Sequence, residues 1–176
     1  MIVVVGGIIT MAIGCDIQIG KVTQVGLPKN ILAGFQTMEY IRAFLSGRMG
    51  WDVIDATLII SGAFGIFRRK TAVQVDGYDT NTVGEDMDLV VKMHHYCRKN
   101  DIPYKVTYVP DPVAWTEVPE DIKTLGRQRE RWQRGLYETL TKHQEMLFNQ
   151  KYGNAGILGF PYFYFLEMLG PLIELP

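Results

Sequence analysis

The sequence predicts an α/β domain, and three features lead to this fold class. Residues 3–11 form an unbroken β-branched run, typical of a strand covered on both faces. Apolar residues recur at helical spacing over residues 31–49, which predicts an amphipathic helix on a sheet. Strand-like and helical segments follow one another from residue 57 to about residue 147. With 47% apolar residues in 176, one core and one domain are expected.

The N-terminal quarter supplies the first strand and the first helix. Residues 2–15 are apolar enough to suggest a signal peptide, but no basic residue precedes the run and glycines interrupt it, which favours a buried strand. Residues 16–29 are turn-rich. In the helix that follows, the face expected to pack on the sheet consists of Leu32, Phe35, Met38, Ile41 and Leu45.

The middle of the chain contains a glycine-interrupted apolar segment. Residues 57–67 are predicted to form a strand, a kink of small residues and a second strand. Gly62 and Gly65 indicate either close approach by a ligand or another segment, or a bulge in a buried strand. A short helix from residue 68 is expected to end near Gly77, a C-cap residue.

The second half alternates again and ends in an aromatic segment. We expect a helix over 84–100, strands over 104–110 and 113–117, and a helix from about 119 to 147. From residue 156 onward the chain is rich in aromatic and aliphatic residues, which favours a membrane interface or the start of a spanning helix. A soluble amphipathic tail that packs on the core is the alternative.

Charge and cysteine content exclude several classes of protein. A net charge of -1 and a pI near 6.3 give no overall attraction to nucleic acid or to acidic membranes. Cys15 and Cys97 match neither a disulfide framework nor a metal-binding spacing. We therefore expect a reducing compartment and no nucleic-acid partner.

An acidic stretch at residues 82–93 carries the first candidate site. Thr82 is predicted as an N-cap, with Glu85 completing a capping box. Asp86 begins a helical stripe with Val90 and Met93, so its carboxylate should lie where a buried helix meets a cleft. It could act there as a general base, or simply be one of the acids that favour helix N-termini.

A second polar stretch covers residues 127–135. The spacing i, i+3, i+4 places Gln128, Arg131 and Trp132 on one helix face. Arg131 could bind a diphosphate with its planar fork, and Trp132 could stack on a sugar. Alternatively, the tryptophan belongs to the core and the arginines form a solvated face.

Together these stretches resemble a known family. The pair Glu85-Asp86 matches the Glu-Asp signature, and Gln128-x-x-Arg131-Trp132 the Gln-x-x-Arg-Trp signature, of inverting GT-A-fold family 2 glycosyltransferases. The similarity is greatest to the membrane-bound processive type, such as cellulose, chitin, poly-N-acetylglucosamine and hyaluronan synthases. It runs over nearly the whole chain and implies the C-terminal, acceptor-side half of the catalytic domain in residues 1–150. Residues 151–176 would be an interfacial segment or the start of a transmembrane one.

The resemblance implies a hexosyltransferase reaction. A nucleotide sugar, expected to be a UDP-sugar, would donate to a glycan or lipid-linked acceptor at the cytoplasmic face of the plasma membrane, with inversion. Asp86 would be the general base and Glu85 a positioning residue. Ser61 and Gly62 would line the floor of the acceptor pocket. Gln128, Arg131 and Trp132 would bind substrate.

The family also implies a divalent metal, Mg²⁺ or Mn²⁺. Asp86-x-Asp88 spells a metal-binding motif, but residues two apart on a helix diverge, so we expect no metal ligands here. In the family the ligands lie in the preceding half of the domain, and this chain alone is expected to be inactive. The vicinal His94 and His95 are predicted as a surface pair.

Two other functions fit the residues. The chain could be a non-catalytic α/β module that docks at a membrane through its aromatic tail. It could also be a hydrolase that uses Glu85 or Asp86 with Glu117 as an acid-base pair.

Overall fold

The structure is a computed structural model that describes residues 1–170, apart from the side chains of Pro112 and Val113. Its centre is a three-stranded sheet in the order β4-β1-β5. The middle strand β1 (Ile2–Met11) pairs in parallel with β5 (Lys105–Thr116) and antiparallel with β4 (Gly65–Phe67). The α/β fold class is therefore confirmed.

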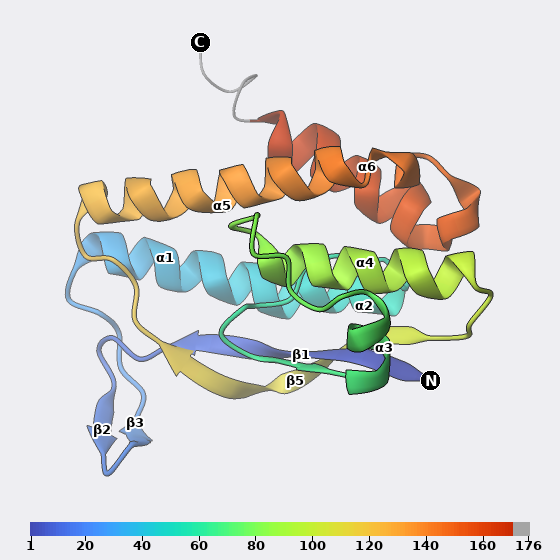
Figure 1. Cartoon of the computed structure of the whole chain (residues 1–176). Coiled ribbons are helices and arrows are strands. Elements are labelled where there is room, and N and C mark those ends of the chain that lie inside the picture. The colour runs from blue at the N-terminus through green and yellow to red at the C-terminus, as the bar shows by residue number, and fades with distance from the viewer. Residues whose placement is uncertain (171–176) are drawn as a thin grey trace.

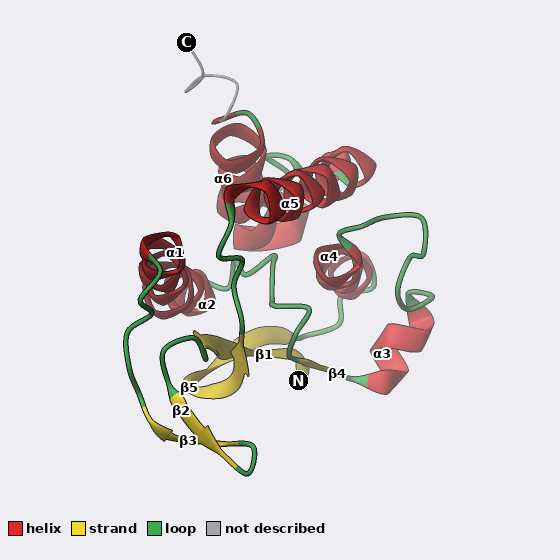
Figure 2. Ribbon diagram, turned by 90° about the vertical axis from the view of Figure 1, so that its left-hand side faces the viewer, coloured by secondary structure: helices red, strands yellow, loops and turns green. Residues whose placement is uncertain are grey.

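The helices form two layers beside the sheet. The inner layer holds α1 (Ile31–Ile41), the π-helical segment η1 (Arg42–Arg48), α2 (Met49–Val53) and α4 (Glu85–Lys99). Figures 1 and 2 show these on one side of the sheet, with α5 (Ile122–Lys142) and α6 (Phe160–Tyr162) beyond them. The short helix α3 (Arg69–Gln74) follows β4.

Smaller elements complete the chain. A hairpin of β2 (Asp16–Gln18) and β3 (Lys21–Gln24) occupies the segment that was expected to be turns. After α5 come the 3-10 turns η2 (Gln144–Met146) and η3 (Gln150–Tyr152). The π-helical segments η4 (Ala155–Gly159) and η5 (Phe163–Met168) flank α6. Among the described residues no helix combines the length and the apolar character needed to cross a bilayer.

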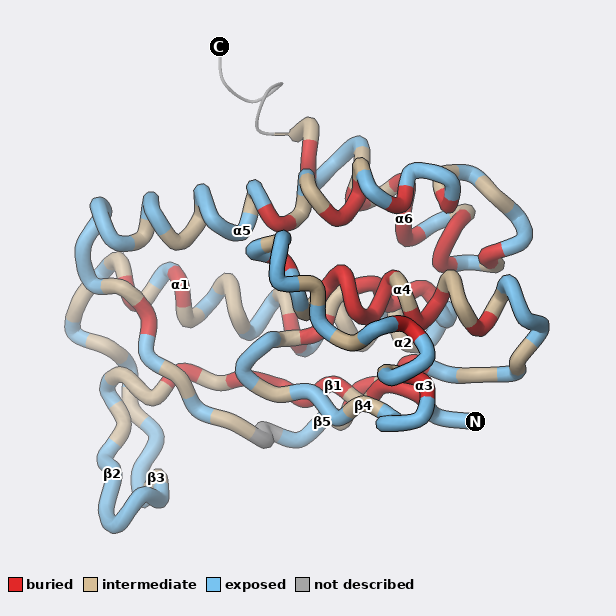
Figure 3. Tube along the Cα trace, viewed as in Figure 1, coloured by how far each residue is buried: buried red, intermediate tan, exposed pale blue. Residues whose placement is uncertain are grey.

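Helix α4 lies between two hydrophobic cores. Val90 and Met93 pack toward the sheet, in the cluster that includes Val4 and Phe44. Met87 and Val91 belong to the cluster formed with α5 and the C-terminal turns. Each fully buried aliphatic side chain contributes roughly 1.5–3 kcal/mol to folding. These two sets of contacts fix the position of the helix, much of which is coloured as buried in Figure 3.

The predicted packing face of the first helix is wrong. Phe35 and Met38 are 67% and 69% exposed, whereas Ala33 is fully buried and Gln36 nearly so. The side chain of Gln36 donates a hydrogen bond to the Pro119 carbonyl at 2.7 Å. This bond orients the helix so that the face with Ala33 and Gln36 points inward. The helix carries apolar residues on two faces, so periodicity alone could not select the buried one. Leu32 is half-buried, and Ile41 and Leu45 are exposed as well.

Two strand predictions also need correction. Residues 57–60 are buried, apart from the half-buried Ile59, but they form no strand. The strand β4 covers only Gly65–Phe67, after an isolated bridge between Ser61 and Phe64. Conversely, the two strands expected between residues 104 and 117 are the single strand β5. The reason is that β5 pairs with β1 along its whole length. The pairing between these two parallel strands shifts register near the prolines of β5 but does not end there.

Candidate active site

Asp86 lies in the first turn of α4, as its sequence position suggests. The N-cap is Gly84, however, and not Thr82. The Thr82 hydroxyl accepts from the Gly84 N–H at 3.1 Å and donates to Glu138 on α5 at 2.9 Å, so the predicted capping box is wrong. The Asp86 carboxylate accepts the N–H of Met87 at 2.8 Å and is half-buried.

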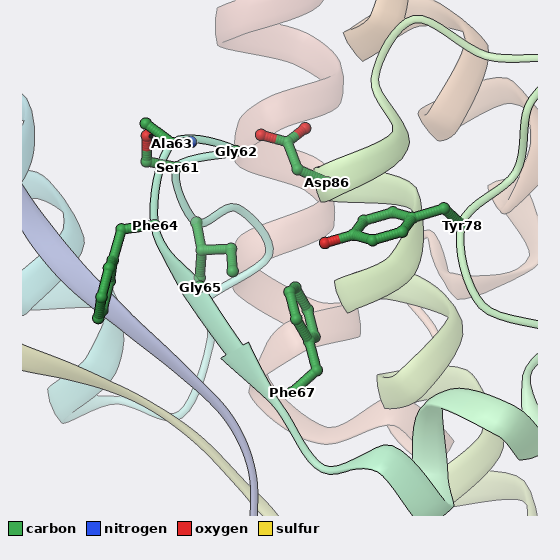
Figure 4. A pocket seen from close by; sticks show the side chains of 9 residues that line it. Ser61, Gly62, Ala63, Phe64, Gly65, Phe67, Tyr78 and Asp86 are labelled. Atoms are coloured by element: carbon green, nitrogen blue, oxygen red, sulfur yellow. Dashed lines mark hydrogen bonds between the residues drawn. The ribbon is translucent and has the colours of Figure 1, made fainter. Parts of the chain in front are cut away.

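A cavity of about 220 Å³ lies in front of this carboxylate. Figure 4 shows Asp86 on one side, the tight loop with Ser61 and Gly62 opposite, and the Tyr78 hydroxyl directed between them. The lining residues are Ile60, Ser61, Gly62, Ala63, Phe64, Gly65, Phe67, Tyr78 and Asp86. The structure thus brings three of the predicted site residues, Ser61, Gly62 and Asp86, to one cavity.

Close approach explains both glycines of the loop. A Cβ atom on Gly62 would lie 3.1 Å from Oδ2 of Asp86, and one on Gly65 would lie 2.4 Å from the Ile60 side chain. At Gly62 the approaching group is therefore the candidate base itself. The loop is closed by a hydrogen bond from the Phe64 N–H to the Ser61 carbonyl at 3.1 Å.

Burial raises the pKa of Asp86 above its usual 3.8, and the neighbouring charge of Glu85 adds to the increase. The N–H of Met87, the Arg48 guanidinium and the N–H of Gly62 act in the opposite direction without cancelling it. A carboxylate with a raised pKa has a greater affinity for a proton, which suits a general base.

Tyr78 and Arg48 belong to this environment although the sequence did not single them out. Burial raises the pKa of Tyr78, and the charge of Asp86 raises it further, so its hydroxyl remains a donor. Backbone φ angles of 60° at Asp76 and 62° at Gly77 turn the chain before Tyr78. The Asp76-Gly77 pair in the sequence indicates this turn, and it was the signal that could have directed attention to Tyr78. Arg48 packs over the Phe44 ring at 4.2 Å and donates to the Tyr108 hydroxyl at 3.0 Å.

The remaining predicted residues lie elsewhere around the site. Glu85 is exposed, and it does not line the cavity. On α5, Arg131 is exposed and Trp132 is 40% exposed, with its ring 6.5 Å from that of Tyr40 on α1. Gln128 has a buried side-chain oxygen that finds no partner among the described residues. None of the three α5 residues lines the cavity with Asp86, and their roles stay predictions.

Asp88 is engaged in a buried ion-pair network. Its carboxylate is inaccessible and lies 3.0 Å from Nζ of Lys142, 2.9 Å from Nε2 of His143 and 3.2 Å from Nζ of Lys92. Burial opposes ionisation, but hydrogen bonds from His143 and Lys142 hold the Asp88 pKa well below its usual value. This carboxylate is therefore occupied on the side of α4 that faces α5.

The described residues do not fit a divalent metal site. No group of three or more His, Cys, Asp or Glu side chains in residues 1–170 converges as metal ligands would. Asp86 faces the cavity, whereas Asp88 is paired with Lys142 and hydrogen-bonded to His143. The two carboxylates of Asp86-x-Asp88 therefore point to different surroundings, since residues two apart on a helix diverge.

The prediction of a surface histidine pair is wrong for His94. Its ring is 2% exposed, with Nε2 2.7 Å from the Thr57 carbonyl and Nδ1 2.5 Å from the Tyr104 hydroxyl. A carbonyl only accepts, so Nε2 carries the proton and Nδ1 accepts from the tyrosine. His95 is partly exposed and lies 2.9 Å from Glu145.

The fold and the cavity define an α/β domain with an acidic site at the start of a buried helix. Comparison with known proteins identifies its family. The model of "Glycosyl transferase family group 2" matches residues 16–174, and the chain belongs to this family, as its two motifs predicted.

Curated relatives include two staphylococcal enzymes. The chain is 30% identical over 130 residues to the poly-beta-1,6-N-acetyl-D-glucosamine synthase of Staphylococcus aureus (strain COL). It is 30% identical over 128 residues to the synthase of the same name from Staphylococcus epidermidis (strain ATCC 35984). The alignments cover 72% and 71% of this chain but only 30% of each relative.

Proposed function

We propose that this chain forms the acceptor side of a GT-A-like domain in an inverting, membrane-associated hexosyltransferase. Family membership supports glycosyl transfer, and similarity to polymer synthases supports a growing glycan as the acceptor. The observation that carries the proposal is the half-buried Asp86 carboxylate, which faces the Ser61–Gly62 loop across a cavity.

In the proposed reaction Asp86 acts as the general base. The acceptor hydroxyl lies in the cavity and attacks the anomeric carbon of the donor sugar. As that carbon–oxygen bond forms, the bond from the anomeric carbon to the diphosphate oxygen breaks, and its electron pair leaves with the nucleoside diphosphate. The hydroxyl proton passes to the Asp86 carboxylate, whose raised pKa favours this transfer.

The other cavity residues would orient the acceptor. The Tyr78 hydroxyl and the Ser61–Gly62 backbone offer hydrogen bonds on two sides of the space. The cavity is smaller than the roughly 300–1,000 Å³ of pockets that enclose drug-sized ligands. It therefore suits one end of a glycan rather than a whole nucleotide sugar.

The donor would bind outside this cavity. We propose a UDP-sugar whose diphosphate contacts Arg131, with Gln128 and Trp132 contacting a sugar and Glu85 positioning the base. A divalent metal on the diphosphate would take its ligands from outside the 170 described residues.

Residues 151–176 are proposed to contact the membrane at its cytoplasmic face, with residues 1–150 as the catalytic part. Phe165 and Leu166, which are 42% and 64% exposed, support an apolar contact there. Residues 171–176 lie outside the described part of the chain.

The decisive experiment supplies membranes carrying the complete protein with a panel of radiolabelled nucleotide sugars. Incorporation of one sugar into polymer is expected, and Asp86→Asn should abolish it while nucleotide binding stays nearly intact. Arg131→Ala should instead weaken binding of the nucleoside diphosphate. Transfer that survives in Asp86→Asn would contradict the base assignment.

The exposed apolar face of α1 favours one alternative, a non-catalytic module that docks at a membrane. Ile31, Phe35 and Met38 are each more than half exposed along this face. Under this alternative, Asp86→Asn would leave the cellular function of the complete protein intact. The hydrolase alternative lacks support, because Glu117 does not line the cavity with Asp86.

A further inference from the structure

The first turn of α4, which carries Asp86, is held in place by contacts from another helix, α5. The N-cap Gly84 has no side chain, so the first turn of α4 receives no side-chain cap there. The contacts that fix this turn and the loop before it come from one face of α5, formed by Gly135, Glu138 and Lys142. Their spacing of three and four residues places them on adjacent turns of α5.

The first contact is a backbone crossing. A Cβ atom on Gly135 would lie 2.7 Å from the backbone of Gly84, and one on Gly84 would lie 2.8 Å from the backbone of Gly135. Both positions therefore require the absence of a side chain. The crossing places α5 directly against the start of α4, two residues from Asp86.

The second contact fixes the loop. Oε2 of Glu138 accepts from the Thr82 hydroxyl at 2.9 Å and from the Val83 N–H at 3.2 Å. Arg134 lies 2.7 Å from the other oxygen, on the same helix. Hydrogen bonds to a charged acceptor are stronger than those between neutral groups. The Glu138 carboxylate therefore restrains Thr82 and Val83, the loop residues just before α4.

The third contact spans the turn. Nζ of Lys142 donates to Asp79 at 2.7 Å and to the buried Asp88 at 3.0 Å, and so connects residues on both sides of Asp86. The same helix carries Gln128, Arg131 and Trp132 in the turns before Gly135. The helix α5 therefore carries one motif of the family and directly contacts the turn that carries the other.

We propose that Glu138 and Lys142 are positioning residues, which hold the Asp86 turn in a fixed relation to the Gln128–Trp132 segment. This inference rests on the proposed function, since it assigns these residues to the geometry of the same transfer step. Glu138 is the sharper test. Its contacts go to a loop near the surface rather than to the core, so its removal should loosen the turn without unfolding the chain.

The experiment combines hydrogen exchange with kinetics. In this chain, Glu138→Ala is expected to accelerate amide exchange in residues 82–88 at least tenfold. Glu138→Gln, which retains an acceptor oxygen, should restore part of the protection. Glu120→Ala removes a carboxylate from an exposed position just before the same helix and should leave exchange unchanged. The variant Lys142→Met tests the third contact in the same way.

In the complete enzyme, Glu138→Ala is expected to lower kcat at least tenfold with KM for the nucleotide sugar within twofold. Glu120→Ala, which removes an exposed carboxylate outside both the Gln128–Trp132 segment and the contacts with the Asp86 turn, should leave both constants unchanged. Unaltered exchange in Glu138→Ala and Lys142→Met, or faster exchange with unchanged kcat, would overturn the positioning role. Absence of transfer by the unsubstituted enzyme would instead refute the proposed function, while the exchange data would still report on the contacts themselves.

Discussion

The buried imidazole of His94 should make the stability of this domain fall as the solution becomes acidic. Burial lowers the His94 pKa from 6.5 to about 4, and the charge of Arg98 contributes. The hydrogen bond to the Thr57 carbonyl and the charge of Asp55 oppose the change but do not cancel it. The ring is therefore neutral in the folded state across much of the acidic range.

The sign and size of the effect come from proton linkage. Between pH 6.5 and pH 4 the unfolded chain binds a proton at His94 and the folded chain does not, so acid favours unfolding. Each unit of pKa difference is worth about 1.4 kcal/mol. A fall from 6.5 to about 4 therefore removes about 3 kcal/mol of stability by pH 4, with none of this loss present above pH 7.

The assay is urea denaturation at a series of pH values from 7.5 to 4, followed by circular dichroism. His94→Gln can keep a donor and an acceptor but does not titrate, so its stability should depend less on pH by about 3 kcal/mol over this range. His95→Gln, the matched control at the partly exposed neighbour, should retain most of the dependence. Parallel curves for the wild type and His94→Gln would refute the reasoning.

Three further predictions concern the candidate site and its support. Asp86→Asn should lower transfer by the complete enzyme at least 10²-fold, the lower end for loss of a general base, with the melting temperature of this chain nearly unchanged. Gly135→Ala should destabilise the chain by about 1–3 kcal/mol because its methyl group meets the Gly84 backbone, as denaturation curves would show. Gly126→Ala, in open space on the same helix, should stabilise by up to about 1 kcal/mol; equal effects of the two would contradict the crossing. Asp88→Leu should cost about 1–3 kcal/mol, because the buried His143 ring loses its hydrogen-bond partner while Lys142 keeps its ion pair with Asp79.

Local sequence patterns were enough to establish the family, the central strand and the helix that bears Asp86. The two short motifs indicated the family, which the comparison over residues 16–174 confirmed. The β-branched run of β1 and the apolar stripe of Val90 and Met93 are strong local patterns, and the structure buries both of them. The placement of Asp86 at the start of a buried helix followed from that stripe.

The faces and contacts that these elements use depend instead on three-dimensional packing. The first helix has two apolar faces, and a hydrogen bond from Gln36 to a carbonyl 83 residues away selects the inner one. Thr82 matches a capping pattern, but its hydroxyl instead donates a hydrogen bond to Glu138 on α5. His94 is buried because the Thr57 carbonyl and Tyr104 satisfy its ring. In each case a polar partner distant in sequence outweighed the local pattern, since a buried polar group is costly unless it is hydrogen-bonded.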